Sequence, residues 1–210
     1  MSFIGFLPGD SSQMIKANEL RDVDRSGLAN AIAIGAPAIA SVIGGAVVEQ
    51  GLWRFYSAHA PAPGGVSAWN AGAWRGAWSR MQPDLYFFGE DAFGNQLVAI
   101  PGHPNAYIWS HESGELTDME LDLFSVIDSV ASHGLDWIDF YGDGSLGVAR
   151  RLLGSIDWGS HLHWATPLIL GGTIQVENIS VMERSVHLLG HGQLWAQVGD
   201  LPPGADVVLR

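Results

Sequence analysis

The centre of the chain consists of apolar segments separated by short links that contain glycine or proline. These segments are DLYFFG (84–89), NQLVAIP (95–101) and AYIWSHESGEL (106–116), which are rich in aromatic and apolar residues. Residues of this kind favour extended strands, and a short link with glycine joins neighbouring strands as a hairpin. The sequence therefore predicts an α+β fold in which a central antiparallel sheet is flanked by helices.

Helices are predicted on both sides of this sheet. Apolar residues recur at helical spacing in VVEQGLWRFYSAHA (47–60) and in a segment that begins at Leu121, and acidic residues before Leu121 suit a helix N-terminus. A Gly-Gly turn, a strand and a last helix are expected before Leu201. The tryptophan-rich link SAWNAGAWRGAW (67–78) contains few basic residues, so we expect it to fold over the core.

We expect one domain over residues 1–210. A chain of 210 residues with 47% hydrophobic residues can bury a sizeable core. Its parts would be a helical N-terminal region (1–60), the sheet, and an α/β C-terminal extension from about 145 to 210. No cysteine is present, which excludes disulfides and thiolate ligands, and the cytoplasm is the simplest expected location.

The stretch 26–48 raises the question of a membrane span. It carries no Asp, Glu, Lys or Arg, and its length approaches the roughly 20 residues that cross a bilayer. It is mostly alanine and glycine, however, with Pro37 in the middle, so a buried helix pair is predicted instead. Acidic residues before it also argue against a secretory signal.

Negative charge is concentrated in the middle of the chain. The net charge is −12, and residues 81–149 hold twelve acidic residues without a lysine or arginine. Such a region repels nucleic acid and anionic lipid and attracts basic partners. The alternative is an ordinary solvated acidic face that keeps the protein soluble.

Few patterns indicate catalysis. Lys16 is the only lysine, and neither a G-x-S-x-G nor a phosphate-binding glycine motif occurs. Glu90 and Asp91 are adjacent, and neighbouring residues of an extended segment point to opposite faces, so they are unsuited to act together on one substrate atom. We predict a turn with outward-facing acids at this point.

Histidines form the one pattern that suggests a metal. His161 and His163 are two residues apart, and His187 and His191 are four apart, so each pair could face one side of a strand or helix. Together they could form a four-imidazole zinc site and a metal-dependent hydrolase. The spacing is permissive and no HEXXH motif accompanies it, which favours ordinary hydrogen-bonded histidines.

Two parts of the chain resemble families of immunity proteins. FGEDAFGNQLVAI, AYIWSHESGEL and the acidic segment that follows resemble the SUKH superfamily, the relatives of a yeast cell-wall-assembly and killer-toxin-resistance regulator. The family's Phe-Gly strand end and acidic Asp-x-x-Gly-x turn match Phe88-Gly89 and 91–95, and its (D/H)-x-E-(T/S)-G-E hairpin resembles 111–115, where His111 directly precedes Glu112 without the residue x. The tail, HWATPLILGGTIQVENISVMERSVHLLGHGQL (163–194), resembles the C-terminal part of type VI secretion immunity proteins.

The resemblance implies an α+β domain that binds a cognate bacterial toxin and blocks it without catalysis. Many toxins of such systems are basic nucleases or deaminases, and an acidic surface can occupy a cleft built for nucleic acid. The implied partner is a basic protein toxin, with no nucleic acid, membrane, metal or cofactor. The candidate toxin-binding residues are Glu90, Asp91, Tyr107, Trp109, Glu112, Glu115, Asp118, Glu120 and Asp122. Besides the hydrolase, a regulatory scaffold stays as an alternative.

Overall fold

The fold was analysed in a computed structural model of the chain. It describes residues 44–48, 53–57, 65–123, 125–127, 129, 157, 159–202 and 204–207. Statements about the structure refer to these residues.

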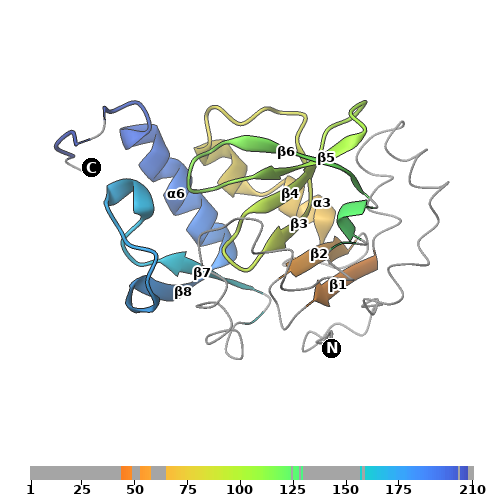
Figure 1. The fold of residues 1–210 in the computed structure, drawn as a ribbon, viewed down its shortest axis with the longest axis horizontal. Coiled ribbons are helices and arrows are strands. Elements are labelled where there is room, and N and C mark those ends of the chain that lie inside the picture. The colour runs from red at the N-terminus through yellow and green to blue at the C-terminus, as the bar shows by residue number, and fades with distance from the viewer. Residues whose placement is uncertain are drawn as a thin grey trace.

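A six-stranded antiparallel sheet, with strands in chain order, forms the centre of the molecule (Figure 1). Its strands are β1 (Gly44–Val48), β2 (Trp53–Ser57), β3 (Tyr86–Asp91), β4 (Gln96–Ala99), β5 (Asn105–Trp109) and β6 (Leu116–Asp122). Each strand pairs with the next, from β1 with β2 to β5 with β6. The predicted central antiparallel sheet is therefore confirmed.

A C-terminal unit packs beside this sheet. Figure 1 shows it in cyan and blue beside the green strands. It consists of the antiparallel pair β7 (Ser160–Trp164) and β8 (Ile179–Glu183), the short helices η6 (Leu168–Leu170) and η7 (Val176–Asn178), and the helix α6 (Arg184–Val198). The amide of Leu162 in β7 donates to the carbonyl of Ala92 after β3, at 2.8 Å, which joins the unit to the central sheet.

Aromatic side chains fill the core between the sheet and the segment that precedes β3. That segment contains α3 (Val66–Asn70) and η3 (Ala73–Ala77). The ring centroids of Trp74 and Phe87 lie 5.2 Å apart, and those of Trp78 and Trp109 lie 4.6 Å apart. All four side chains are buried. The tryptophan-rich link therefore folds over the core as predicted.

The predicted helix over 47–60 is wrong, because β1 ends in this range and β2 occupies 53–57. The side chains of Trp53, Arg54, Phe55 and Tyr56 are all buried. A strand that is covered on both faces does not alternate between apolar and polar residues. Its sequence therefore lacks the pattern that would distinguish a strand from a helix. The helical N-terminal region proposed for 1–60 is accordingly not helical where the structure describes it.

The apolar stretch 26–48 ends in a strand and not in the expected helix pair, since β1 covers 44–48. Its residues 26–43 lie outside the described part of the chain. Among the described residues, no helix has both the length and the apolar character that a membrane crossing requires.

The expected helix at Leu121 begins two residues later. Residues 116–122 pair with β5 as β6, and helical residues follow from Leu123. The carboxylate of Asp122 accepts hydrogen bonds from the Ser125 amide at 3.0 Å and hydroxyl at 2.8 Å, as at a helix N-terminus. Most of the segment expected to continue this helix lies outside the described residues.

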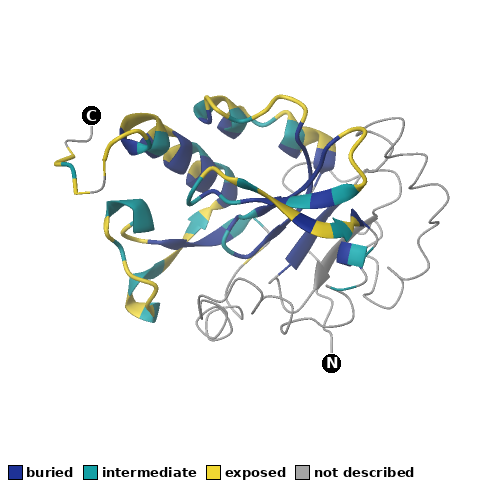
Figure 2. Cartoon of the chain, turned by 45° about the horizontal axis from the view of Figure 1, so that its top comes forward, coloured by how far each residue is buried: buried dark blue, intermediate teal, exposed yellow. Residues whose placement is uncertain are grey.

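The predicted glycine turn, strand and last helix of the tail are confirmed. Gly171 adopts φ 85°, which suits glycine, and β8 runs directly into α6. At the start of α6 the side chain of Glu183 accepts hydrogen bonds from the amides of Ser185 at 3.1 Å and Val186 at 2.8 Å. Figure 2 shows that α6 is buried on one face and exposed on the other.

Two glycines of α6 provide a test of how closely the helix packs. A Cβ at Gly192 would lie 2.7 Å from the Ala77 Cβ and 2.8 Å from the Trp78 Nε1, whereas a Cβ at Gly190 meets nothing within 4 Å. We expect Gly192→Ala to lower the free energy of unfolding by about 1–3 kcal/mol through overpacking. Gly190→Ala should raise it by up to about 1 kcal/mol, because alanine is the better helix former.

Chemical denaturation of both variants and the parent protein would measure these changes. Equal effects at the two positions would contradict the close contact between α6 and η3.

Candidate functional site

The carboxylate of Glu90, in β3, is fully buried between two arginines. Its Oε1 lies 3.4 Å from Arg54 Nη1, and its Oε2 accepts a hydrogen bond from Arg184 Nη2 at 3.0 Å. Arg54 comes from β2 and also donates to the carbonyls of Ser160 at 2.6 Å and Asp157 at 3.2 Å. These ion pairs therefore join the central sheet to β7 and to the first residue of α6.

Neutral side chains complete this network. Tyr56 Oη lies 2.7 Å from both Glu90 Oε2 and Gln96 Oε1, so it can donate to either. Gln96 Nε2 donates to the Gly94 carbonyl at 2.8 Å and lies 3.2 Å from Glu90 Oε2. The Arg184 guanidinium stacks over the Trp69 ring at 3.6 Å from its centroid, an arrangement that favours a cation.

The arginines keep Glu90 ionised. Burial would raise the pKa of this carboxyl, but Arg184, His161 and Arg54 outweigh it and hold the pKa well below its ordinary value. An ionised carboxylate only accepts hydrogen bonds. Each neighbouring group must therefore present a proton to it.

This requirement determines which ring nitrogens carry a proton in the chain of hydrogen bonds that runs from Glu90 through His161 to His187 on α6. His161 Nε2, on β7, lies 3.0 Å from Glu90 Oε2, and burial lowers the pKa of His161 to about 4, although Glu90 opposes this. A neutral His161 thus donates from Nε2 and accepts at Nδ1. His187 Nδ1 lies 3.1 Å from His161 Nδ1 and must be the donor, which leaves a lone pair on His187 Nε2.

Three histidines lie together at the end of this chain of hydrogen bonds. His187 and His191 are four residues apart on α6, with ring centroids at 4.8 Å, and His111 from the hairpin between β5 and β6 lies 4.7 Å and 4.9 Å from them. All three are buried, and each offers a ligand atom within 4.8 Å of the others. Among the described residues, they form the group whose spacing suits a metal ion.

The carboxylate of Glu112 faces the same point. Its Oε1 lies 3.3 Å from His111 Nε2 and 4.0 Å from His191 Nε2. Burial would raise the pKa of Glu112, yet His111 and His191 hold it below the ordinary value. This site of His111, His187, His191 and Glu112 is named the histidine cluster below.

Polar atoms of the histidine cluster lack hydrogen bonds. Among the described residues, His111 Nε2, His187 Nε2, His191 Nδ1 and both carboxylate oxygens of Glu112 are buried without a hydrogen bond of normal geometry, although the Glu112 carboxylate interacts with His111 and with the Leu168 amide. A buried polar atom without a partner costs about 1–3 kcal/mol, and such atoms are few in folded proteins. Their accumulation at one point marks this position as a candidate for a ligand.

The predicted four-histidine set is only partly brought together. His187 and His191 lie in the cluster, and His161 contacts His187 from the opposite side. His163 lies with its ring 5.5 Å from that of His187, and its Nδ1 is 3.2 Å from the Trp164 carbonyl. Sequence reasoning missed His111, because it is distant in the chain from the other histidines and only strand pairing brings its hairpin to α6.

The outward orientation expected for Glu90 and Asp91 is wrong, because every residue of β3 is buried. Asp91 turns its carboxylate back into the chain, where Oδ1 accepts from the amides of Phe93 and Asn95, each at 2.9 Å. Burial raises the pKa of Asp91 to about 6, although Asn95 opposes it. Asn95 Nδ2 donates to Asp91 Oδ2 at 2.7 Å, and Asn95 Oδ1 accepts from His111 Nδ1 at 3.2 Å.

The remaining candidate toxin-binding residues differ in exposure. Trp109 is buried in the core, like Glu90 and Asp91, so these three side chains are not available at the surface. Tyr107 and Glu112 are half-buried. The exposed members are Glu115, Asp118, Glu120 and Asp122, which lie just before or along β6.

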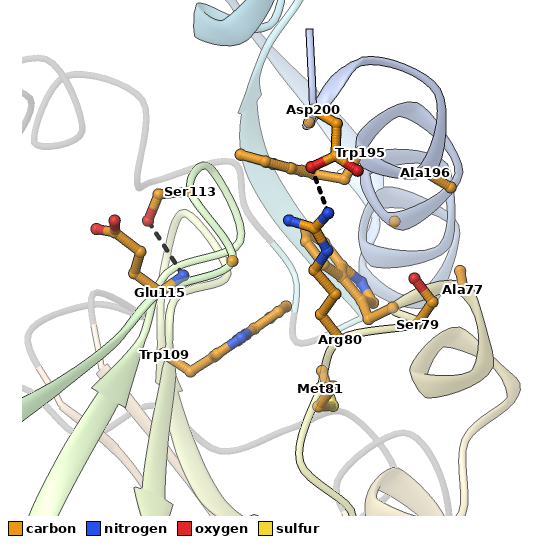
Figure 3. Close-up of a pocket in the computed structure, with 14 residues that line it drawn as sticks. Ala77, Ser79, Arg80, Met81, Trp109, Ser113, Glu115, Trp195, Ala196 and Asp200 are labelled. Atoms are coloured by element: carbon orange, nitrogen blue, oxygen red, sulfur yellow. Dashed lines mark hydrogen bonds and ion pairs between the residues drawn. The ribbon is translucent and has the colours of Figure 1, made fainter.

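A pocket of about 510 Å³ lies on another side of the same hairpin (Figure 3). Its walls include Trp109 from β5 and Trp195 from α6, and the ion pair between Arg80 and Asp200 crosses its rim. No histidine lines it, and its charged side chains are Arg80, Asp200 and Glu115. The pocket and the histidine cluster are therefore separate features.

The Glu90 network generates a stability prediction. Glu90→Gln removes the charge that pairs with two buried guanidinium groups, and we expect it to lower the free energy of unfolding by about 3–5 kcal/mol. The control is Glu177→Gln on exposed η7, which should change it by less than about 0.5 kcal/mol. Urea denaturation at neutral pH measures both, and a cost for Glu90→Gln below about 1 kcal/mol would contradict the structural role of the network.

Comparisons with known proteins bear on the fold alone. No protein-family model matches the chain, and no curated protein does. Among solved structures, the crystal structure of Atu4351 from Agrobacterium tumefaciens is similar, with a TM-score of 0.53 and 13% sequence identity. The match covers 90% of this chain and 85% of that one. At this identity the similarity shows that the two chains share an α+β fold.

Proposed function

We propose that the chain is an immunity protein that binds a basic bacterial toxin through an acidic edge and thereby blocks it. The acidic edge consists of Glu115, Asp118, Glu120 and Asp122. The observation that carries the proposal is the exposure of all four side chains on the last strand of the described sheet or just before it. The sequence resemblance to SUKH and type VI secretion immunity proteins supports the same function.

The backbone of β6 supports this use of the edge. Asn105 pairs with Asp122 and Tyr107 with Asp118, so the register shifts between these pairs. Glu120 lies within this bulge at φ 55°, and its amide donates to Asp118 Oδ1 at 2.7 Å. Bulges disfavour continuous pairing with another strand and redirect side chains. An edge of this kind suits recognition by charge better than the addition of a further strand.

Electrostatics supports a basic partner. Residues 81–149 hold twelve acids and no lysine or arginine, so the field around the edge is not cancelled by basic residues nearby in the chain. Complementary charge accelerates association and disfavours partners of like charge. A toxin that acts on nucleic acid needs a basic cleft, and an acidic edge competes for such a cleft.

The buried network supports a binding function over a catalytic one. The Glu90 carboxylate has no exposed surface and makes its ion pairs within the protein. The pocket beside Trp195 is lined by none of the buried acids or histidines. The Glu90 carboxylate is therefore not accessible to a substrate as a general acid or base.

Co-expression tests the proposed function. In a bacterial host that produces the toxin encoded next to the gene of this chain, co-expression should restore growth, and the two proteins should elute as one complex. Undiminished killing together with separate elution would contradict the proposal.

Charge reversal tests the acidic edge. We expect Glu115→Lys/Glu120→Lys to weaken toxin binding by at least about 10-fold at low ionic strength, with a smaller loss at high salt because ions screen exposed charges. Both side chains are exposed, and neither carboxylate makes a hydrogen bond to another described residue, so the substitutions should leave folding intact. Binding can be measured by calorimetry over a range of salt concentrations.

A matched control is Glu177→Lys/Asp206→Lys, which makes the same change in net charge at exposed positions outside β6. It should retain most of the affinity. Equal losses in the two double variants would show that net charge, and not the acidic edge, governs binding.

A further inference from the structure

The geometry points to a structural metal site in the histidine cluster: we propose that His111, His187, His191 and Glu112 bind one divalent transition-metal ion of the zinc type. The inference is independent of the proposed toxin binding. It concerns how the hairpin between β5 and β6 is attached to α6.

The residue types and their separations fit such an ion. Imidazole nitrogens and a carboxylate oxygen are common zinc ligands, at about 2.0–2.2 Å, and in a tetrahedron these distances place ligand atoms about 3.4 Å apart. The three histidines offer nitrogens that lie within 4.8 Å of one another, and Glu112 Oε1 lies 3.3 Å from His111 Nε2. The three histidines form the centre of the proposed site, and Glu112, which lies near His111 and His191, is proposed as the fourth ligand.

The protons are already placed for metal binding at two ligands. His187 donates from Nδ1 to His161, which in turn donates to Glu90, so the lone pair of His187 is on Nε2. His111 lies with Nδ1 against Asn95 Oδ1, and an amide oxygen only accepts, so the lone pair of His111 is also on Nε2. Hydrogen bonds of this kind from the second ring nitrogen orient metal-binding histidines in proteins.

Two of the buried atoms without a hydrogen bond of normal geometry are Nε2 of His111 and Nε2 of His187, the nitrogens whose lone pairs face the cluster. The alternative is an ion pair between a protonated His111 and Glu112. That pair would leave the lone pair of His187 Nε2 without a partner, whereas one cation satisfies the whole set.

The site has the character of a structural centre. All four ligands come from the protein, and the three histidines are at most 5% exposed. Catalytic zinc sites keep a position open for water or substrate, and structural sites do not. The ion would join the hairpin that carries His111 to the face of α6 that carries His187 and His191.

Titration of tag-free protein with Zn²⁺, after removal of metal by a chelator, tests the proposal. We expect one equivalent to bind with a dissociation constant of about 1 µM or tighter. His187→Asn and His191→Asn should each weaken binding by at least about 100-fold. His103→Asn, at an exposed position, and His163→Asn, beside the cluster, should each keep the affinity of the parent within about threefold.

Binding that survives both substitutions on α6, or the absence of stoichiometric binding by the folded parent, would overturn the proposal. A Co²⁺ titration of the parent protein keeps the test valid if the variants do not fold. A strong visible spectrum of tetrahedral Co²⁺ supports the site, whereas the weak spectrum of an octahedral ion on exposed carboxylates would overturn it. Toxin binding is a separate measurement, so either proposal can fail alone.

Discussion

The carboxylate of Glu90 is the point on which the arrangement of the two sheets depends. A buried charge is unfavourable unless partners replace the water that it loses. Those partners come from separate elements: Arg54 from β2, His161 from β7 and Arg184 from the start of α6. They are far from Glu90 in the chain, so the charge is compensated only when the central sheet and the C-terminal unit have come together. The network therefore disfavours other placements of β7 and α6 on the central sheet.

The same network supports the histidine cluster. Because His161 donates a hydrogen bond to Glu90 from Nε2, it accepts one at Nδ1, and this leaves the lone pair of His187 on Nε2. The turn held by Asp91 and Asn95 likewise leaves the lone pair of His111 on Nε2. Two adjacent residues of β3 thus act on two different histidines. Their opposite directions follow from the alternation of side chains along a strand. The alternation that argued against a catalytic acid pair therefore explains how both acids orient the cluster.

The strands and turns that could be predicted from the sequence are those with local signals. Gly-bearing links between apolar segments identified β3 to β5, and the glycine turn and the helical pattern identified the tail. Residues 47–60 were assigned to a helix because a strand buried on both faces, as Trp53 to Tyr56 show, carries no alternation. The start of the helix after β6 was misplaced because pairing with β5, a tertiary contact, extends the strand to Asp122.

The site was less predictable, because its members meet only in the folded chain. The spacing of His187 and His191 indicates a shared helix face, which the structure bears out, but the predicted set also contains His161 and His163, whereas the structure places His111 in the cluster instead. The exposure of the acidic side chains could not be predicted either, because nothing in the neighbouring sequence distinguishes the buried Glu90 from the exposed Glu120. The burial of an acid depends on what packs over its strand, and that is decided by β7 and α6.

The hairpin at 110–115 connects the interior of the molecule with its acidic edge. Glu112 faces inward to the histidines, while Glu115 is exposed where β6 begins. Backbone hydrogen bonds from the Ser110 amide to the Glu115 carbonyl at 2.9 Å, and from Gly114 to Ser110 at 2.8 Å, make the hairpin compact. Trp195 Nε1 of α6 donates to the Glu112 carbonyl at 2.9 Å. Because α6 holds one side of this hairpin and β6 leaves from the other, contacts that fix Glu112 also restrict the position from which the acidic edge is presented.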